Sequence, residues 1–275
     1  RGVSLVLAHT PSAQRGQVGG VTFTGIGLGT LITAAMGSVL PWIGPSLAWL
    51  FAGLCAALAT ALAWRAWPGL AEAADDSDDE PVVLRGGRGL WVPGLMIAAY
   101  ATLAVSVVPH AVFWVDFLVR ERGLTPALAA GQWWLVGFGS LLGPLLMARL
   151  ARRSGQGLAL LICYASTGLA IVAPVLGDGL LVFGASSLII GALAPASVSM
   201  TSILLAQVVG AQAHARWWAA ATLAFAIGQG VGAALMARAY AASELYAPLF
   251  GVAALIAALA LLLAVLAQGL RWRIN

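Results

Sequence analysis

The sequence predicts an all-α integral membrane protein, a helical bundle with about eight transmembrane helices and the tail of a ninth. Three observations predict this fold class. Hydrophobic residues make up 61% of the 275 residues and charged residues only 9%, against roughly 25% in a soluble domain. The charged residues leave apolar stretches of membrane-spanning length between them. The basic residues gather on alternate connections between those stretches, as the positive-inside rule expects.

The longest stretch without a charged residue, 16–64, predicts two spans. A membrane helix needs about 20 mostly apolar residues, and the segment PWIGP at 41–45 predicts a tight turn between the two. Each later stretch of at least 21 uncharged residues has room for one span. The predicted helices are 19–40, 46–66, 90–118, 127–149, 158–176, 180–208, 216–237 and 247–270.

The arginines predict how these spans are oriented. All 14 basic residues are arginine, which indicates a GC-rich bacterial source. If the segment 8–18 is cytoplasmic, cytoplasmic segments hold ten arginines: Arg15, Arg65, Arg85, Arg88, Arg149, Arg152, Arg153, Arg216, Arg271 and Arg273. The outer segments hold three: Arg120, Arg122 and Arg238. This bias predicts a multi-pass protein of the bacterial inner membrane with a cytoplasmic C-terminus.

Residues 68–89 form the one long polar segment and predict a cytoplasmic acidic linker. Six of the ten acidic residues lie there without the spacing of a calcium loop. The linker separates residues 1–67, with two spans and the helix tail 1–10, from residues 90–275, with six spans. Six spans are half of a transporter built from two repeats. Because the chain begins with Arg1, we expect three spans and most of a fourth to precede it.

Polar side chains inside the spans give the candidate cavity residues. The spans 46–66 and 247–270 are almost wholly apolar and read as peripheral. The span 180–208 carries many hydroxyls around Pro195, and we expect nearby hydroxyls to satisfy the backbone that this proline frees. The candidates for lining a substrate cavity are Tyr100, His110, Gln132, Trp133, Gln207 and Gln229. For His110 and Gln229, a packing role and a substrate contact both stay open.

Asp116 and Arg120 are candidates for gating or proton coupling. They stand four residues apart and so share one helix face. The alternative is a structural ion pair at the outer interface, beside the aromatic belt.

The chain shows no catalytic constellation, metal-ligand spacing or cofactor motif. Cys55 and Cys163 lie in apolar runs and read as packing residues. The leading hypothesis is a secondary transporter that moves a small solute across the lipid bilayer by alternating access. We expect a monomer with no nucleic-acid partner, and a proton is the candidate coupling ion. The alternative is a polytopic membrane enzyme or assembly scaffold that works at the membrane surface through the acidic run.

Three stretches carry a family resemblance. The segment VFWVDFLVRERGL at 112–124 precedes GQWWLVGFGSLLGP and then a loop motif formed by Gly143, Arg149, Arg152, Arg153 and Gly155. The other two are RGQVGGVTFTGIGLG at 15–29 and TLAFAIGQGVG at 222–232. In this order the chain resembles the YbfB/YjiJ-like branch of the major facilitator superfamily, as helices five to twelve of twelve.

The resemblance implies two six-helix bundles around a central cavity, with helices six, nine and twelve at the periphery. It also implies that the arginine motif locks the cytoplasmic side of the bundle, besides anchoring the topology at the headgroups. The motif here lacks the usual acidic residue, and Gly29 is followed by Thr30 where the antiporter motif has Gly-Pro. The resemblance therefore leaves the direction of transport open.

Overall fold

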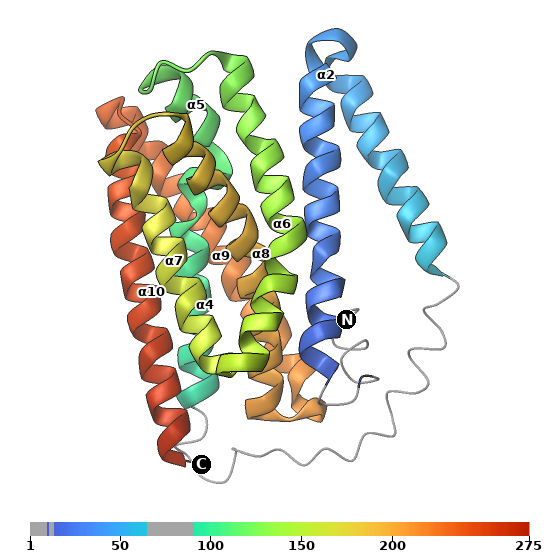
Figure 1. The fold of residues 1–275 in the computed structure, drawn as a ribbon, viewed down its shortest axis with the longest axis vertical. Helices are drawn as coiled ribbons and strands as arrows, with labels where there is room; N and C mark the ends of the chain where they lie inside the picture. The colour runs from blue at the N-terminus through green and yellow to red at the C-terminus, as the bar shows by residue number, and fades with distance from the viewer. Residues whose placement is uncertain (1–9, 11–13, 65–90, 275) are drawn as a thin grey trace.

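The computed structural model describes residues 10, 14–64 and 91–274, and every element in these ranges is a helix (Figure 1). The predicted helix tail before residue 10 and the predicted linker at 68–89 lie outside the described residues. The elements are α2 (Arg15–Trp64), α4 (Trp91–Ser106), η4 (Pro109–Phe113), α5 (Trp114–Arg120), α6 (Pro126–Ser154), α7 (Gln156–Leu176), α8 (Leu180–Val209), α9 (Ala211–Ser243) and α10 (Ala247–Ile274).

The prediction of eight spans is confirmed. Eight stretches of the described residues are long and apolar enough to cross a membrane. Several helices extend beyond their predicted ends: α9 includes both Arg216 and Arg238, the charged residues that bounded its apolar stretch. The reason is physical, because charges mark the limits of the hydrocarbon layer whereas helices continue into the headgroup region.

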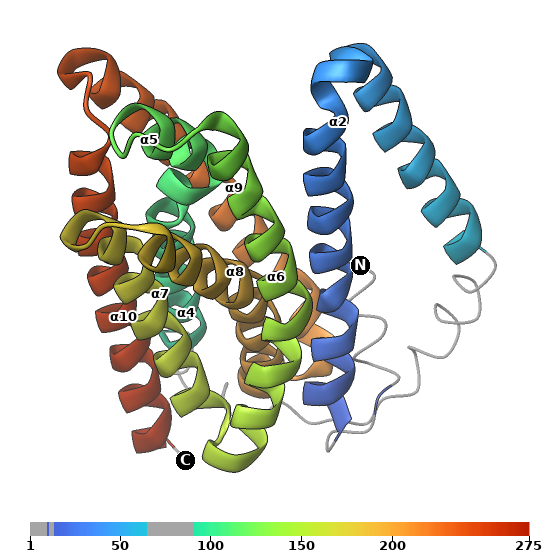
Figure 2. The ribbon, with the colours of Figure 1, turned by 45° about the horizontal axis from the view of Figure 1, so that its top comes forward.

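The predicted turn at 41–45 is a sharp kink within α2. Gly44 adopts φ 73° and ψ 164°, a conformation that only glycine accepts easily. The kink divides α2 into two limbs, Gln17–Leu40 and Trp42–Trp64. Figures 1 and 2 show the first limb beside α6 and the second leaning away from the other helices.

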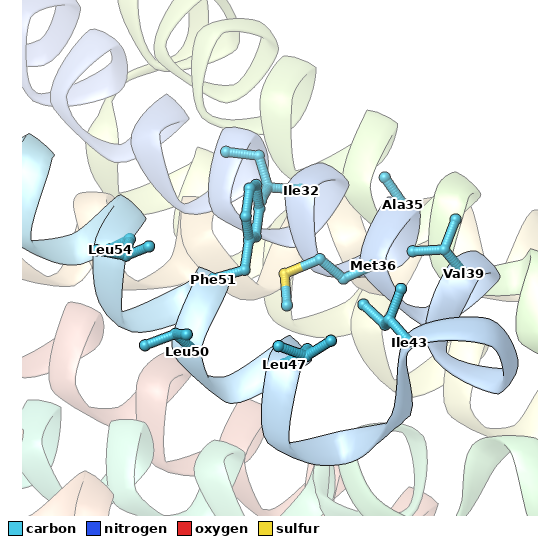
Figure 3. A pocket seen from close by; sticks show the side chains of 9 residues that line it. All are labelled: Ile32, Ala35, Met36, Val39, Ile43, Leu47, Leu50, Phe51 and Leu54. Atoms are coloured by element: carbon cyan, nitrogen blue, oxygen red, sulfur yellow. The ribbon is translucent and has the colours of Figure 1, made fainter.

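The second limb has little packing beyond the first. Trp49 and Leu62 expose 79% and 74% of their surface. An apolar pocket of about 630 Å³ lies between the limbs, where Ile32 and Met36 face Leu50 and Phe51 (Figure 3). This exposure is consistent with the peripheral position predicted for the span 46–66.

The predicted helix 90–118 is interrupted. The α-helix α4 ends at Ser106, and η4 adds a π-helical turn before α5 begins at Trp114. Pro109 has no N–H, so it cannot bond the carbonyl one turn earlier, and the backbone widens there. The interruption lies next to His110, at the centre of the site described below.

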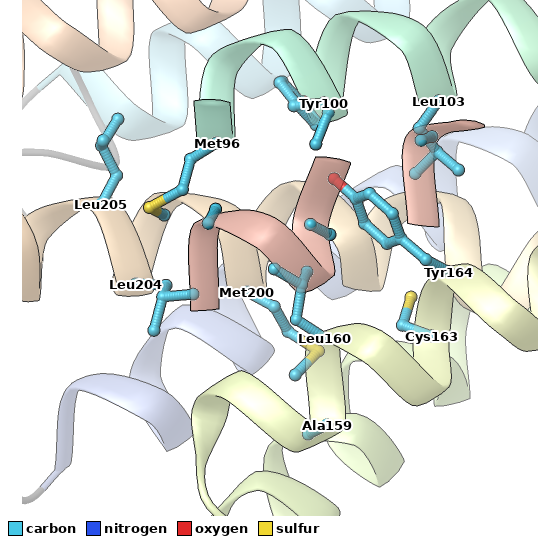
Figure 4. Packing of buried hydrophobic residues seen from close by; sticks show 14 of the residues in the cluster. Met96, Tyr100, Leu103, Ala159, Leu160, Cys163, Tyr164, Met200, Leu204 and Leu205 are labelled. Atoms are coloured by element: carbon cyan, nitrogen blue, oxygen red, sulfur yellow. The ribbon is translucent and has the colours of Figure 1, made fainter. Parts of the chain in front are cut away.

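Helices α4 to α10 pack around two clusters of buried side chains. One cluster joins α4, α7 and α8 through Met96, Tyr164 and Met200, and it includes Cys163 (Figure 4). The other surrounds Trp114 and Phe250. The full burial of Cys163 agrees with its predicted packing role.

Glycines allow α6 and α8 to cross at backbone contact. A Cβ atom added at Gly143 would lie 2.0 Å from the Ala192 carbonyl oxygen, and one at Gly191 would lie 2.2 Å from that of Val136. The first limb of α2 meets α6 in the same way, because a Cβ at Gly27 would lie 2.2 Å from the Leu141 nitrogen. Small residues thus replace the hydrophobic effect as the source of close helix packing.

Candidate functional site

A cavity of about 310 Å³ lies where α2, η4, α6, α8 and α9 meet. Its polar lining consists of Thr30 from α2, His110 from η4, Trp133 and Ser140 from α6, and Gln229 from α9. A second cavity of about 470 Å³ shares Thr30 and Trp133 and continues along α2. Residues of the predicted first half and of the predicted six-helix half therefore both line these cavities.

His110 is the most constrained of these groups. Its side chain is 4% exposed. The ring stacks on Trp114 at 4.5 Å between centroids and meets Phe250 edge-on at 5.1 Å. Nε2 lies 2.7 Å from the Ser186 hydroxyl oxygen, while Nδ1 is buried with no hydrogen-bond partner in the described structure.

The partner of Ser186 fixes which nitrogen of His110 carries the proton. The Ser186 hydroxyl donates to the Ala170 carbonyl at 2.7 Å. That carbonyl would normally bond the N–H four residues later, but Pro174 stands there and has none. Because its one proton is committed, Ser186 accepts from His110, and the ring is the Nε2–H tautomer with Nδ1 as a lone-pair acceptor.

The same arrangement recurs at Ser140. Pro195 in α8 leaves the Gly191 carbonyl without its helical donor, and the Ser140 hydroxyl of α6 donates to it at 2.9 Å. The sequence predicted that hydroxyls near Pro195 would satisfy this backbone. The donor that satisfies Gly191 instead belongs to another helix, because the glycine crossing brings α6 within reach.

Gln132 is buried beside the cavity instead of lining it. The Trp114 indole N–H donates to Ser187 at 3.0 Å, and the Ser187 hydroxyl donates to Gln132 Oε1 at 3.1 Å. These two hydrogen bonds hold Trp114 against the His110 ring. Gln132 thus acts as an interhelical tie between α6 and α8.

The remaining cavity candidates divide into two groups. Trp133 and Gln229 line the cavity, and the Gln229 amide makes no hydrogen bond within the described residues. Tyr100 is packed against Trp218 and Phe225 in the hydrophobic cluster. Gln207 is exposed near the end of α8, where its Oε1 accepts from Arg271 at 3.1 Å. Tyr100 and Gln207 therefore lie outside the cavity.

Asp116 and Arg120 bond to tyrosines instead of to each other. Tyr246 donates to Asp116 Oδ2 at 3.0 Å, and Arg120 lies 3.5 Å from the Tyr240 hydroxyl. The two tyrosines stack at 4.1 Å. Burial raises the pKa of Tyr246, followed by its hydrogen bonds to Tyr240 and Asp116, so its hydroxyl stays a donor. The direct ion pair, the alternative to a gating or coupling role, is replaced among the described residues by contacts to Tyr240 at the end of α9 and Tyr246 before α10.

Two neighbours of Arg120 cap helices, which sequence reasoning missed. The Glu121 carboxylate accepts from the backbone N–H groups of Tyr246 and Ala247, the latter at 3.0 Å, and so caps the start of α10. Arg122 donates to the Pro174 carbonyl at 2.7 Å near the end of α7. A carboxylate at a helix start and a cation at a helix end both complement the helix dipole.

The arginine motif lies at the end of α6. Arg149, Arg152 and Arg153 are exposed on its last turns, and Gly155 ends the helix with φ 85°. Gly143, by contrast, is buried at the α8 crossing. Among the described residues, no group of three or more metal-ligating side chains gathers at a possible metal site.

Eight apolar spans define a multi-pass membrane protein, and the cavity between α2, η4, α6, α8 and α9 is consistent with a transport protein. The family model described as uncharacterised MFS-type transporter YbfB matches residues 2–266. The chain belongs to this family of the major facilitator superfamily, as its loop and helix motifs predicted. No curated protein matches the chain significantly.

Proposed function

We propose that the protein is a secondary transporter that moves a small solute across the bacterial inner membrane by alternating access. The cavity supports this proposal, because Thr30 of α2 and Gln229 of α9 line it together with residues of η4, α6 and α8. Rocking of α2 against α6 and α8 would change the access to such a site. The protein works as a monomer, with its linker and C-terminus in the cytoplasm.

A substrate-panel assay tests this function. The full-length protein, reconstituted in proteoliposomes, is expected to accumulate or release at least one small solute, with a rate that depends on an imposed solute or proton gradient. Empty liposomes and a Gly191→Leu variant serve as controls, since a leucine at Gly191 cannot fit beside Val136. If no solute in a broad panel moves faster than in empty liposomes, the proposal is wrong.

The enzyme alternative makes a separate prediction. A surface enzyme would depend on the acidic run, so replacing Asp75, Asp76, Asp78 and Asp79 with asparagine would abolish its activity. We predict that these four replacements change transport by less than about twofold, because the sequence predicts an acidic linker outside the spans, whose composition favours charge over substrate contacts. Uptake by the full-length variant measures this. Loss of transport would favour the alternative.

A further inference from the structure

The two cavities beside α2 adjoin each other. Both are lined by Ile26 and Thr30 of α2 and by Trp133 of α6. Glycines of α2 keep the second cavity open, because a Cβ atom added at Gly29 or Gly37 would meet nothing within 4 Å. A solute at the junction of the two cavities would therefore contact α2 and α6 together.

Two threonines of α2 present hydroxyl groups to this space. Thr33 is exposed and Thr30 is half-buried, and both line the second cavity. The Thr30 hydroxyl donates its proton to the Ile26 carbonyl at 2.9 Å. The Thr33 hydroxyl donates to the Gly29 carbonyl, also at 2.9 Å. Since each oxygen keeps two lone pairs, a solute donor gains a bond there without breaking one, whereas a solute acceptor must first displace the carbonyl.

The lining of both cavities is uncharged in the described part of the chain. It contains no aspartate, glutamate, lysine or arginine, and His110 is the neutral tautomer described above. A charged solute would lose its hydration here and meet no opposite charge, which is costly. Apolar surface is available instead, from Ile26 and from the rings of Trp133 and Phe225. The lining therefore favours a neutral solute with an apolar body.

We propose that these cavities take an uncharged solute whose apolar body packs on Trp133 and whose O–H or N–H group donates to the hydroxyl oxygens of Thr30 and Thr33. The inference rests on the proposed function only in taking the cavities as the solute site. Alcohols, phenols and amides with an apolar body belong to this class of solute, whereas carboxylates and ammonium ions do not. The two threonines are specificity-determining residues, because the preference for a donor comes from their oxygens.

Protection of a cysteine in the second cavity tests the proposal. Ala130 lines this cavity and is exposed, so Ala130→Cys is introduced into the full-length protein in nanodiscs after Cys55 and Cys163 are changed to alanine. The rate of labelling by N-ethylmaleimide is measured with and without a probe solute. Leu128→Cys is the reference, because Leu128 is exposed in the same helix but lines neither cavity.

The probes share one aromatic ring and differ in donor and charge. 4-Ethylphenol is neutral and has a donor, and 4-ethylanisole lacks the donor. Tyramine and 4-hydroxyphenylacetate keep the phenol donor but add a positive and a negative charge at neutral pH. Referred to its concentration in the nanodisc lipid, 4-ethylphenol is expected to protect position 130 at least about fivefold better than 4-ethylanisole, because it makes one more hydrogen bond. The charged probes are expected to give no protection, and no probe should affect position 128.

Variants of the two threonines test the acceptors. Thr30→Val and Thr33→Val together remove both oxygens at nearly constant volume, so we expect 4-ethylphenol to lose its advantage over 4-ethylanisole. Thr30→Ser and Thr33→Ser keep the oxygens and should keep the advantage. Thr60→Val is the matched control, because Thr60 donates to the Ala56 carbonyl at 2.8 Å in the same way but lies in the second limb outside both cavities. It should leave protection unchanged.

Four results would overturn the inference: no protection by 4-ethylphenol at its solubility limit, equal protection by 4-ethylanisole, equal protection by a charged probe, or an undiminished donor advantage in the valine pair. These readouts are independent of the transport assay. Protection without any solute movement in proteoliposomes would remove the proposed function and keep the binding site. Transport of charged solutes without protection by 4-ethylphenol would remove this inference and keep the proposed function.

Discussion

Gln229 and His110 differ in how much freedom the structure leaves them. The His110 ring is fixed by Ser186, Trp114 and Phe250, whereas the Gln229 amide is half-buried and makes no hydrogen bond within the described residues. An amide with unused donors and acceptors inside a membrane is available to a solute. Gln229 is therefore the side chain whose removal should affect transport most directly.

We predict that Gln229→Leu lowers uptake at least about fivefold, since a lost hydrogen bond costs about 1 kcal/mol, while expression stays normal. Gln207→Leu is the matched control, because Gln207 is exposed and bonds Arg271 away from the cavity. It should retain uptake. Initial rates in proteoliposomes, corrected for protein incorporated, measure both. Normal kinetics for Gln229→Leu would remove this residue from the site.

Three of the polar residues that line the cavity could be predicted from the sequence, but their hydrogen-bond partners could not. His110, Trp133 and Gln229 could be found because polar side chains are rare in membrane helices. Tyr100 and Gln207 met the same criterion but lie elsewhere, since polarity alone does not tell which face of a helix a residue occupies. The His110–Ser186 bond joins positions 76 residues apart, and no local pattern predicts such a pair.

At the scale of the elements, glycine contacts determine how closely helices approach. Gly143→Ala would place a methyl group 2.0 Å from the Ala192 carbonyl oxygen, whereas nothing lies within 4 Å of a Cβ at Gly131 in the same helix. We predict that Gly143→Ala destabilises the protein by about 1–3 kcal/mol through overpacking and that Gly131→Ala is close to neutral. Unfolding in detergent measures both, and equal stability of the two variants would contradict the packing described.

The cap of α10 makes a second prediction at this scale. Glu121→Ala removes the acceptor of two N–H groups at the helix start and should cost about 0.5–2 kcal/mol. Glu121→Gln keeps an oxygen acceptor and should recover much of that loss. Thermal unfolding of the two variants compares them. If Gln is as destabilising as Ala, charge rather than hydrogen bonding would account for the cap.

The helix spans were predictable because hydrophobic length is a local property of the sequence. The interruption at η4 was not, although Pro109 was visible. A proline inside a helix does not always interrupt it. Pro174 and Pro195 lie within continuous helices, where Ser186 and Ser140 donate to the carbonyls that these prolines leave unpaired. Those donors come from other helices, so the outcome at each proline depends on tertiary packing.

At the scale of the whole molecule, the proposed alternating access would require α2 to move relative to α6 and α8. Its first limb contacts α6 and α8, and its second limb is largely exposed. The cavity lies at this contact, so any change in the angle of α2 alters access to His110 and Gln229. The fold thus places the proposed solute site at the boundary between two groups of helices.

The most direct test of alternating access is side-specific labelling of a cysteine in the cavity. Ala111→Cys lines the cavity without replacing a polar group, and Cys55 and Cys163 are first changed to alanine. Arg153→Cys, exposed at the end of α6, serves as the one-sided reference. In proteoliposomes of known orientation, we predict that membrane-impermeant maleimide reaches position 111 from either face and position 153 from one. Labelling of position 111 from a single face under every gradient would contradict alternating access.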